Sequence, residues 1–273
     1  MSSGIALAPK VPRNLKATAI VSVALVAACA VSSLFFPWHA NRGPGLVFGF
    51  LAAFLFAFEM LYPWRRRLAS RFLNTARNWL QAHVYLGVIT LVSVFIHAGF
   101  RWPTGALGWS LMMLSVWTTL TGLLGVWLQK WIPSALADGL TVEVLYERIP
   151  AILDKLRTEA EALVANSSDR LKRFYDREAR QSMGSVSGSW GYLFNVAAGR
   201  ERALEKFRRM SQFVDPSEQD RVEDLMTIYT EKLELDAQYS LQSILRRWQV
   251  LHVPAAGLLI GLLVVHIAVW IVY

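Results

Sequence analysis

Five long apolar runs, separated by short polar segments, dominate the first half of the chain and its carboxyl-terminal end. They cover residues 17–36, 46–62, 79–100, 107–128 and 250–272. Each approaches or exceeds the roughly 20 residues that a helix needs to cross about 30 Å of hydrocarbon. Because lipid offers no water to satisfy backbone polar groups, such segments form helices. The pattern predicts an all-α membrane protein built on a bundle of five transmembrane helices.

The segment between the fourth and fifth runs has a different pattern, in which apolar residues recur at helical spacing among many charges. This pattern is found in 142–165, 171–183 and 200–213, and from Asp220 almost unbroken into the last apolar run. Asp215-Pro216-Ser217 is typical of a helix start. We therefore expect transmembrane helices 1–4 in 1–128, a helical insertion in 129–247, and a fifth helix in 248–273 that completes the bundle.

Basic residues are placed beside the apolar runs. The net charge is +8, yet 129–247 contains 18 Lys+Arg against 19 Asp+Glu, and the rest of the chain has Glu59 as its single carboxylate. Three basic residues precede the first run, and five arginines separate the second and third. The opposite loops contain Arg42 and Arg101 alone. Positive-inside logic places the amino terminus and 129–247 in the cytoplasm and the carboxyl terminus outside. No nucleic-acid partner is implied.

The first apolar run also fits a signal peptide, because a basic start and an apolar core are shared by both kinds of segment. We expect it to be retained as an anchor helix. The chain has one cysteine, Cys29. A disulfide, a covalent CxxCH haem attachment and a cysteine-ligated iron–sulfur cluster within the chain are thereby excluded.

Four of the five histidines form two pairs with identical spacing. His83 and His97 lie in the third apolar run, and His252 and His266 lie in the fifth. Fourteen residues at 100° each fall about 40° short of four full turns, so both members of a pair share a helix face about 21 Å apart along the axis. The two helices should run parallel, which would place His83 level with His252 and His97 level with His266.

This arrangement suits haem iron, which takes two axial ligands from opposite directions, and neutral imidazole is a suitable ligand. By the predicted orientation, His83 and His252 form the inner pair, near the cytoplasm, and His97 and His266 form the outer pair. A porphyrin also needs a flat slot, and Gly87 and Ala256, each four residues after an inner histidine, meet that need. Thr90, Ser93, Gly257 and Gly261 would widen the slot. The alternatives are interhelical hydrogen bonding by single histidines and two-histidine zinc or copper sites, which would lack ligands. We expect two non-covalent, bis-histidine haems b.

Further residues are candidates for supporting roles. Arg77, Arg101, Arg246 and Arg247 lie near the ends of the histidine-bearing helices and could pair with haem propionates or serve as ordinary topology anchors. Glu59 is expected to pair with Arg65, or else to take up protons at a quinone site. Trp79, Trp102, Trp248 and Trp270 are interpreted as interface-belt residues. His39 is interpreted as a surface residue.

The motifs resemble the dihaem transmembrane cytochromes b, chiefly the bacterial ferric-reductase-like transmembrane domain and more distantly the respiratory cytochromes b. The matching stretches are His83-Val-Tyr-Leu-Gly87, Ile96-His97-Ala98-Gly99-Phe100, Thr121-Gly122-Leu-Leu-Gly125, and Leu251-His252-Val-Pro254 leading to His266. The resemblance covers about a quarter of the chain and implies a location in the bacterial inner membrane. The flavin and nicotinamide domains of ferric reductases are not expected here.

Three functions follow from these features. The first is an electron-carrying subunit of a larger redox complex, with iron–sulfur, flavin or c-type cytochrome partners and membrane lipid around it. The second is a self-contained quinol- or metal-reducing membrane oxidoreductase with a substrate site at one face. The third is a haem-free membrane scaffold or transporter. A reduced-minus-oxidised spectrum separates the third from the other two.

Overall fold

The computed structural model describes residues 13–36, 38–64, 76–139, 145–188, 190–193 and 200–272. Five of its helices are long and apolar enough to cross a membrane. They are α1 (Arg13–Phe35), α2 (Gly43–Glu59), α4 (Ala76–His97), α5 (Ala106–Gly139) and α10 (Gln219–Val272). No strand is found in the described ranges. The prediction of an all-α membrane protein with five spanning helices is confirmed.

Two compact units make up the chain. One joins Met1–Val126 to Val250–Tyr273, and the other is Trp127–Gln249. The division falls close to the boundaries expected at residues 128 and 248. Large apolar side chains such as Ile20, Phe54 and Val264 are exposed on the first unit, as expected for helices that contact lipid.

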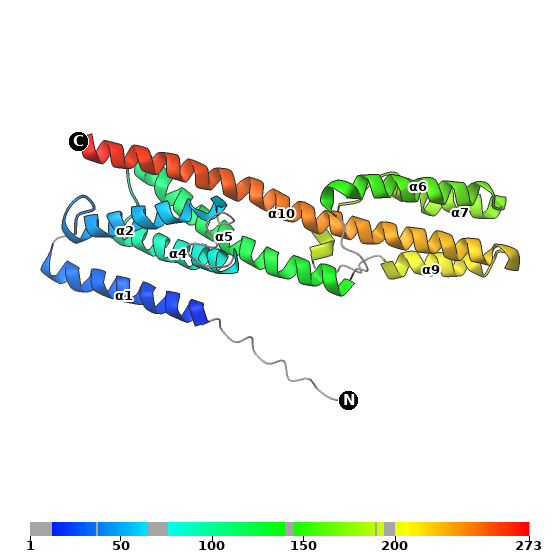
Figure 1. Ribbon diagram of the computed structural model, residues 1–273, viewed down its shortest axis with the longest axis horizontal. Helices are drawn as coiled ribbons and strands as arrows, with labels where there is room; N and C mark the ends of the chain where they lie inside the picture. Colours follow the sequence, from blue (N-terminus) through cyan, green and yellow to red (C-terminus); the bar gives the residue numbers. More distant parts are fainter. Residues whose placement is uncertain are drawn as a thin grey trace, which may run out of the picture. The chain divides into compact units, whose positions relative to one another are not determined.

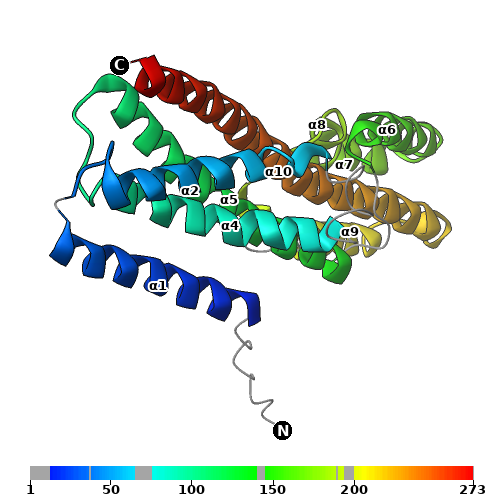
Figure 2. The ribbon, with the colours of Figure 1, turned by 60° about the vertical axis from the view of Figure 1, so that its left-hand side comes forward.

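Within the first unit, α4 lies alongside both α2 and α1 (Figures 1 and 2). Cys29, Phe48 and Ile96 form a buried cluster between these three helices. α4 and α10 run in the same direction, whereas α2 and α5 run in the opposite one (Figure 1). The turn after α4 uses positive φ angles at Gly99 and Phe100, and a side chain at Gly99 would collide with the ring of Trp38.

Two helices extend beyond the predicted spans. α5 continues through Pro133 to Gly139, past the expected end at residue 128. α10 is unbroken from Gln219 to Val272 and contains Pro254. A proline inside a helix removes one backbone hydrogen bond but does not force an end, so the patterns in 220–247 and 250–272 belong to one helix.

The second unit is helical, as expected. The short helices η2 (Tyr146–Arg148), α6 (Ile149–Ala165), α7 (Asp169–Glu178), α8 (Arg180–Met183), η3 (Trp190–Leu193), α9 (Arg200–Ser211) and η4 (Pro216–Glu218) precede α10. α6, α7 and α9 pack against the first part of α10 (Figure 1) around a core that includes Leu156, Leu171, Phe207 and Leu225. The helix expected over 171–183 is interrupted at Ala179. Residues 140–144, the start of the pattern predicted from Val142, lie outside the described ranges.

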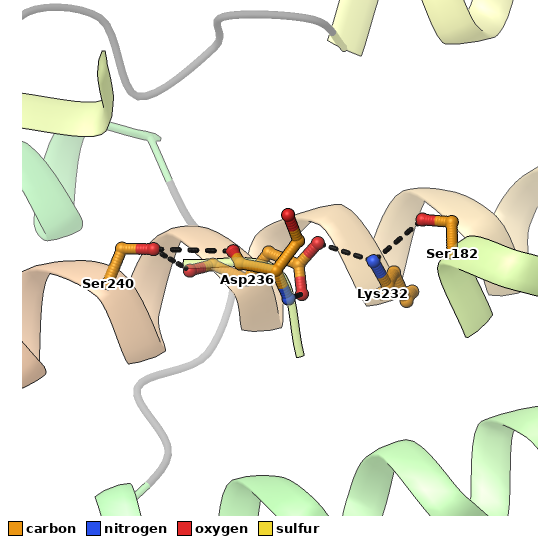
Figure 3. Close-up of polar contacts among 5 residues, drawn as sticks. Ser182, Lys232, Asp236 and Ser240 are labelled. Atoms are coloured by element: carbon orange, nitrogen blue, oxygen red, sulfur yellow. Dashed lines mark hydrogen bonds and ion pairs between the residues drawn. The ribbon is translucent and has the colours of Figure 1, made fainter. Parts of the chain in front are cut away.

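A buried ion pair within this part of α10 is hydrogen-bonded to α8 and to the chain that follows α8 (Figure 3). Lys232 has no exposed surface, and its Nζ donates to Asp236 Oδ2 at 2.5 Å and to Ser182 Oγ at 2.8 Å. Asp236 Oδ1 accepts the backbone N–H of Ser187 at 2.9 Å. Because each charged group has hydrogen-bonding partners, these contacts offset the cost of removing the two charges from water.

Candidate functional site

The four paired histidines are brought together in the first unit. His83 and His97 lie on α4, and His252 and His266 lie on α10. All four are half-buried. Because α4 and α10 run in the same direction (Figure 1), each end of the pair of helices has one histidine from each helix, as the spacing predicts.

The histidines at the carboxyl-terminal ends of the two helices lie close together. The ring centroids of His97 and His266 are 6.4 Å apart, and their planes are nearly perpendicular at 84°. An imidazole nitrogen bonds a transition metal at about 2 Å and the ring centroid lies about 1 Å beyond, so two imidazoles on opposite sides of one metal have centroids about 6 Å apart. The spacing therefore suits shared ligation.

The other two histidines lie near each other on the same two helices. His83 and His252 are close enough for their protonated forms to repel each other. The ring of His83 stacks on Tyr62, with centroids 4.3 Å apart and planes at 21°. Among the described residues, no group of three or more His, Cys, Asp or Glu side chains gathers around one point. The candidate ligands occur in pairs.

Helix α2 holds both histidines of α4. The Nδ1–H of His97 donates to the carbonyl oxygen of Gly45 at 2.9 Å, and Nδ1 of His83 pairs with Oε2 of Glu59. Gly45 and Glu59 are also fourteen residues apart. Since α2 runs opposite to α4, one helix face supplies an acceptor to each histidine.

Close packing fixes the ring of His97 further. A Cβ atom at Gly49 would lie 2.7 Å from His97 Nδ1 and 2.8 Å from Cε1, well inside van der Waals contact. Glycine at this position thus allows the ring to lie against the α2 backbone. Gly45 and Gly49 could not be identified from the sequence, because apolar periodicity does not reveal which face of α2 meets α4.

Helix α5 holds His252 in a similar way. Thr121 Oγ1 lies 2.9 Å from His252 Nδ1, and a Cβ at Gly122 would lie 3.5 Å from His252 Cε1. Thr121 and Gly122 belong to one of the stretches on which the family resemblance rests. With Nδ1 hydrogen-bonded, a neutral imidazole keeps the lone pair of Nε2 for a ligand. Three of the four histidines have this second partner.

The small residues expected on the histidine face fall into two groups. No heavy atom of the described chain lies within 4 Å of a Cβ built at Gly87, Gly257 or Gly261, and Ala256 is half-buried. Thr90 and Ser93 are instead buried, and their hydroxyls bond to carbonyls of their own helix. Of the open positions, Gly87 lies one turn after His83 on the same face of α4. Gly257 and Gly261 are exposed and lie on the side of α10 away from His252, so, contrary to expectation, they do not widen a slot there.

The candidate arginines do not contact the histidines in the described contacts. Arg77, Arg101 and Arg247 are exposed. Arg246 pairs with Glu147 and lies 4.2 Å from the centroid of the Tyr146 ring. Its guanidinium is therefore engaged within the second unit. A propionate role remains a prediction for all four.

Two interpretations change with the structure. Trp79 is only 1% exposed and stacks on Phe58 with centroids 5.6 Å apart, so it is a core residue and not an interface-belt residue. Glu59 pairs with His83, while the expected partner Arg65 lies outside the described ranges. His39 is exposed, as expected.

Comparison of the chain with protein-family models, with curated proteins and with solved structures finds no match.

Proposed function

We propose that this multi-pass membrane protein is a dihaem b-type cytochrome subunit that carries electrons across the membrane within a larger redox complex. Bound haem would supply a reversible one-electron iron couple. The chain would supply two pairs of axial imidazoles, His83 with His252 and His97 with His266. With two protein imidazoles holding each haem, each site would favour electron transfer over oxygen binding.

The observation that carries the proposal is the separation of His97 and His266. Their centroid distance of 6.4 Å agrees with the separation of about 6 Å expected for two imidazoles on one metal. At 84° the two ring planes are perpendicular, so the rings are not stacked on each other. The opposed rings lie on parallel helices, and the inner pair recurs about 21 Å away along the axis.

The hydrogen bonds at Nδ1 support the same function. Metal-binding histidines almost always donate the second ring N–H to a carbonyl, a carboxylate or water. Gly45, Glu59 and Thr121 provide a carbonyl, a carboxylate and a hydroxyl for this purpose. These contacts fix the ring orientation and direct Nε2 away from the supporting helix. A purely structural histidine would not require its second nitrogen to stay available.

An open position next to His83 also suits a flat macrocycle. Gly87, one turn after His83 on the same face of α4, leaves open space where a side chain would otherwise project. Arg77, Arg101, Arg246 and Arg247 are the cations nearest the histidines in sequence and are proposed partners for the propionates.

The test is the haem content of the full chain purified in detergent. We expect two low-spin b haems per chain in the pyridine haemochrome assay and in the reduced-minus-oxidised spectrum. His39→Ala is the matched control, because this histidine is exposed and lies outside the proposed sites, so both haems should be retained. A chain that reconstitutes with no haem would refute the proposal and favour a scaffold or transporter.

A further inference from the structure

Glu59 distinguishes the two proposed haem sites chemically. Nδ1 of His83 pairs with the Glu59 carboxylate, whereas Nδ1 of His97 donates to a backbone carbonyl. On the other helix, the partner of His252 is the hydroxyl of Thr121. Of the three hydrogen-bonded histidines, one therefore has an acidic partner and two have neutral ones.

The Glu59 carboxylate is set deep in the first unit. Its side chain is 13% exposed, and its second oxygen, Oε1, is buried with no hydrogen-bonding partner among the described residues. Tyr62 covers the other side of the His83 ring. The carboxylate is thus held against the imidazole with little water to screen it, and charge interactions are strongest in such surroundings.

We propose that Glu59 is a positioning residue that lowers the midpoint potential of the haem at His83 and His252 below that of the haem at His97 and His266. A carboxylate that accepts Nδ1–H makes the imidazole a more basic ligand. A more basic ligand and a nearby negative charge both stabilise ferric iron, which carries one more positive charge than ferrous iron. This inference rests on the proposed function.

The difference in midpoint potential sets the direction of electron flow between the two proposed haem sites. Electrons move spontaneously from the haem of lower potential to the haem of higher potential. The haem held by the inner pair, His83 and His252, is then the electron donor, and the haem held by the outer pair, His97 and His266, is the electron acceptor. With the orientation expected from the basic loops, the downhill direction is from the cytoplasmic side to the outside.

The experiment is a redox titration of the full chain, followed at the haem α-band, for wild type and Glu59→Gln. Glutamine keeps an acceptor oxygen for His83 but removes the charge. We expect both haems to be retained and one midpoint potential to rise by about 59 mV, which corresponds to a tenfold change in the ferric-to-ferrous binding ratio. Glu161→Gln, which removes an exposed carboxylate paired with Arg157 on α6, is the control and should shift neither potential.

A variant that binds only one haem shows which haem changes its midpoint potential. Adding Glu59→Gln to His97→Ala, which should keep only the inner haem, must give the same rise. Glu59→Asp, which restores the charge, should return the potential toward the wild-type value. The inference is overturned if both haems are present and neither potential moves, if both move equally, or if the shift belongs to the outer haem.

If Glu59→Gln loses a haem, the midpoint potentials of the two single-haem histidine variants test the inference instead. His97→Ala should retain the inner haem, and His83→Ala should retain the outer one. The inner haem must titrate at the lower potential, and the reverse order overturns the inference. A wild-type chain without haem would instead refute the proposed function itself, so the two failures are distinguishable.

Discussion

The methyl group added by Gly49→Ala should prevent binding of the outer haem, the one proposed at His97 and His266. In Gly49→Ala the new Cβ would lie 2.7 Å from His97 Nδ1. Ordinary van der Waals contact begins near 3.4 Å, so the ring must retreat by about 0.7 Å or α2 must separate from α4. Either movement strains the 2.9 Å hydrogen bond from His97 to the carbonyl of Gly45.

The expected cost follows from these two effects. Overpacking of a close-packed site costs about 1–3 kcal/mol, and loss of the hydrogen bond costs about 0.5–1.5 kcal/mol. At 1.4 kcal/mol per factor of ten, a combined cost of about 1.5–4.5 kcal/mol weakens haem binding at this site by roughly 10- to 1,600-fold. Alanine is a better helix former than glycine by about 1 kcal/mol, so α2 itself should not be weakened.

The assay is the number of haems per chain after purification, together with the redox titration of what remains. Gly49→Ala should retain the inner haem with its wild-type potential and lose most of the outer one. Gly105→Ala is the matched control, since no described atom lies within 4 Å of its added Cβ. Two haems with unchanged potentials in Gly49→Ala would refute the placement of His97 against α2.

Three further predictions follow from other contacts. Gly87→Leu should fold but lose haem, because its open side is the proposed slot; normal haem content would show that the side faces only lipid. Thr121→Val removes the partner of His252 and should weaken haem binding at the inner site by about 10- to 100-fold, measured by haem retention on dilution, and unchanged retention would contradict the role of this contact. Asp236→Ala leaves the Lys232 charge buried and should destabilise the second unit by about 3–5 kcal/mol, measured by thermal unfolding and limited proteolysis. Replacing both residues of that pair by apolar ones should restore much of the loss, and equal losses in the two variants would contradict the argument.

The sequence was sufficient to place the helices and to pair the histidines. Apolar runs of about 20 residues predict spans from length alone, and the fourteen-residue spacing needs only the helical repeat. The parallel course of α4 and α10 followed from the number of spans between them. Run length, residue spacing and the number of spans can all be read directly from the sequence, and the helices of the structure agree with them.

The supporting contacts could not be predicted, because they depend on how each helix is rotated about its own axis. Glu59 was expected to pair with a nearby arginine, yet it lies against His83 from another helix. Trp79 looked like an interface residue from its position near the end of an apolar run, but it faces α2. In lipid the outer faces are as apolar as the core, so hydropathy does not separate them. One signal was present: Gly45 and Glu59 repeat the histidine spacing.

The most direct test of the account is whether the histidines act in the stated pairs. Each of the four should be replaced by alanine in turn, and the haem that remains should be identified by its α-band and midpoint potential. We predict that His97→Ala and His266→Ala lose the same haem, that His83→Ala and His252→Ala lose the other, and that His97→Ala/His266→Ala still binds one. Loss of different haems within a pair, or a full haem complement in any single variant, would contradict the account.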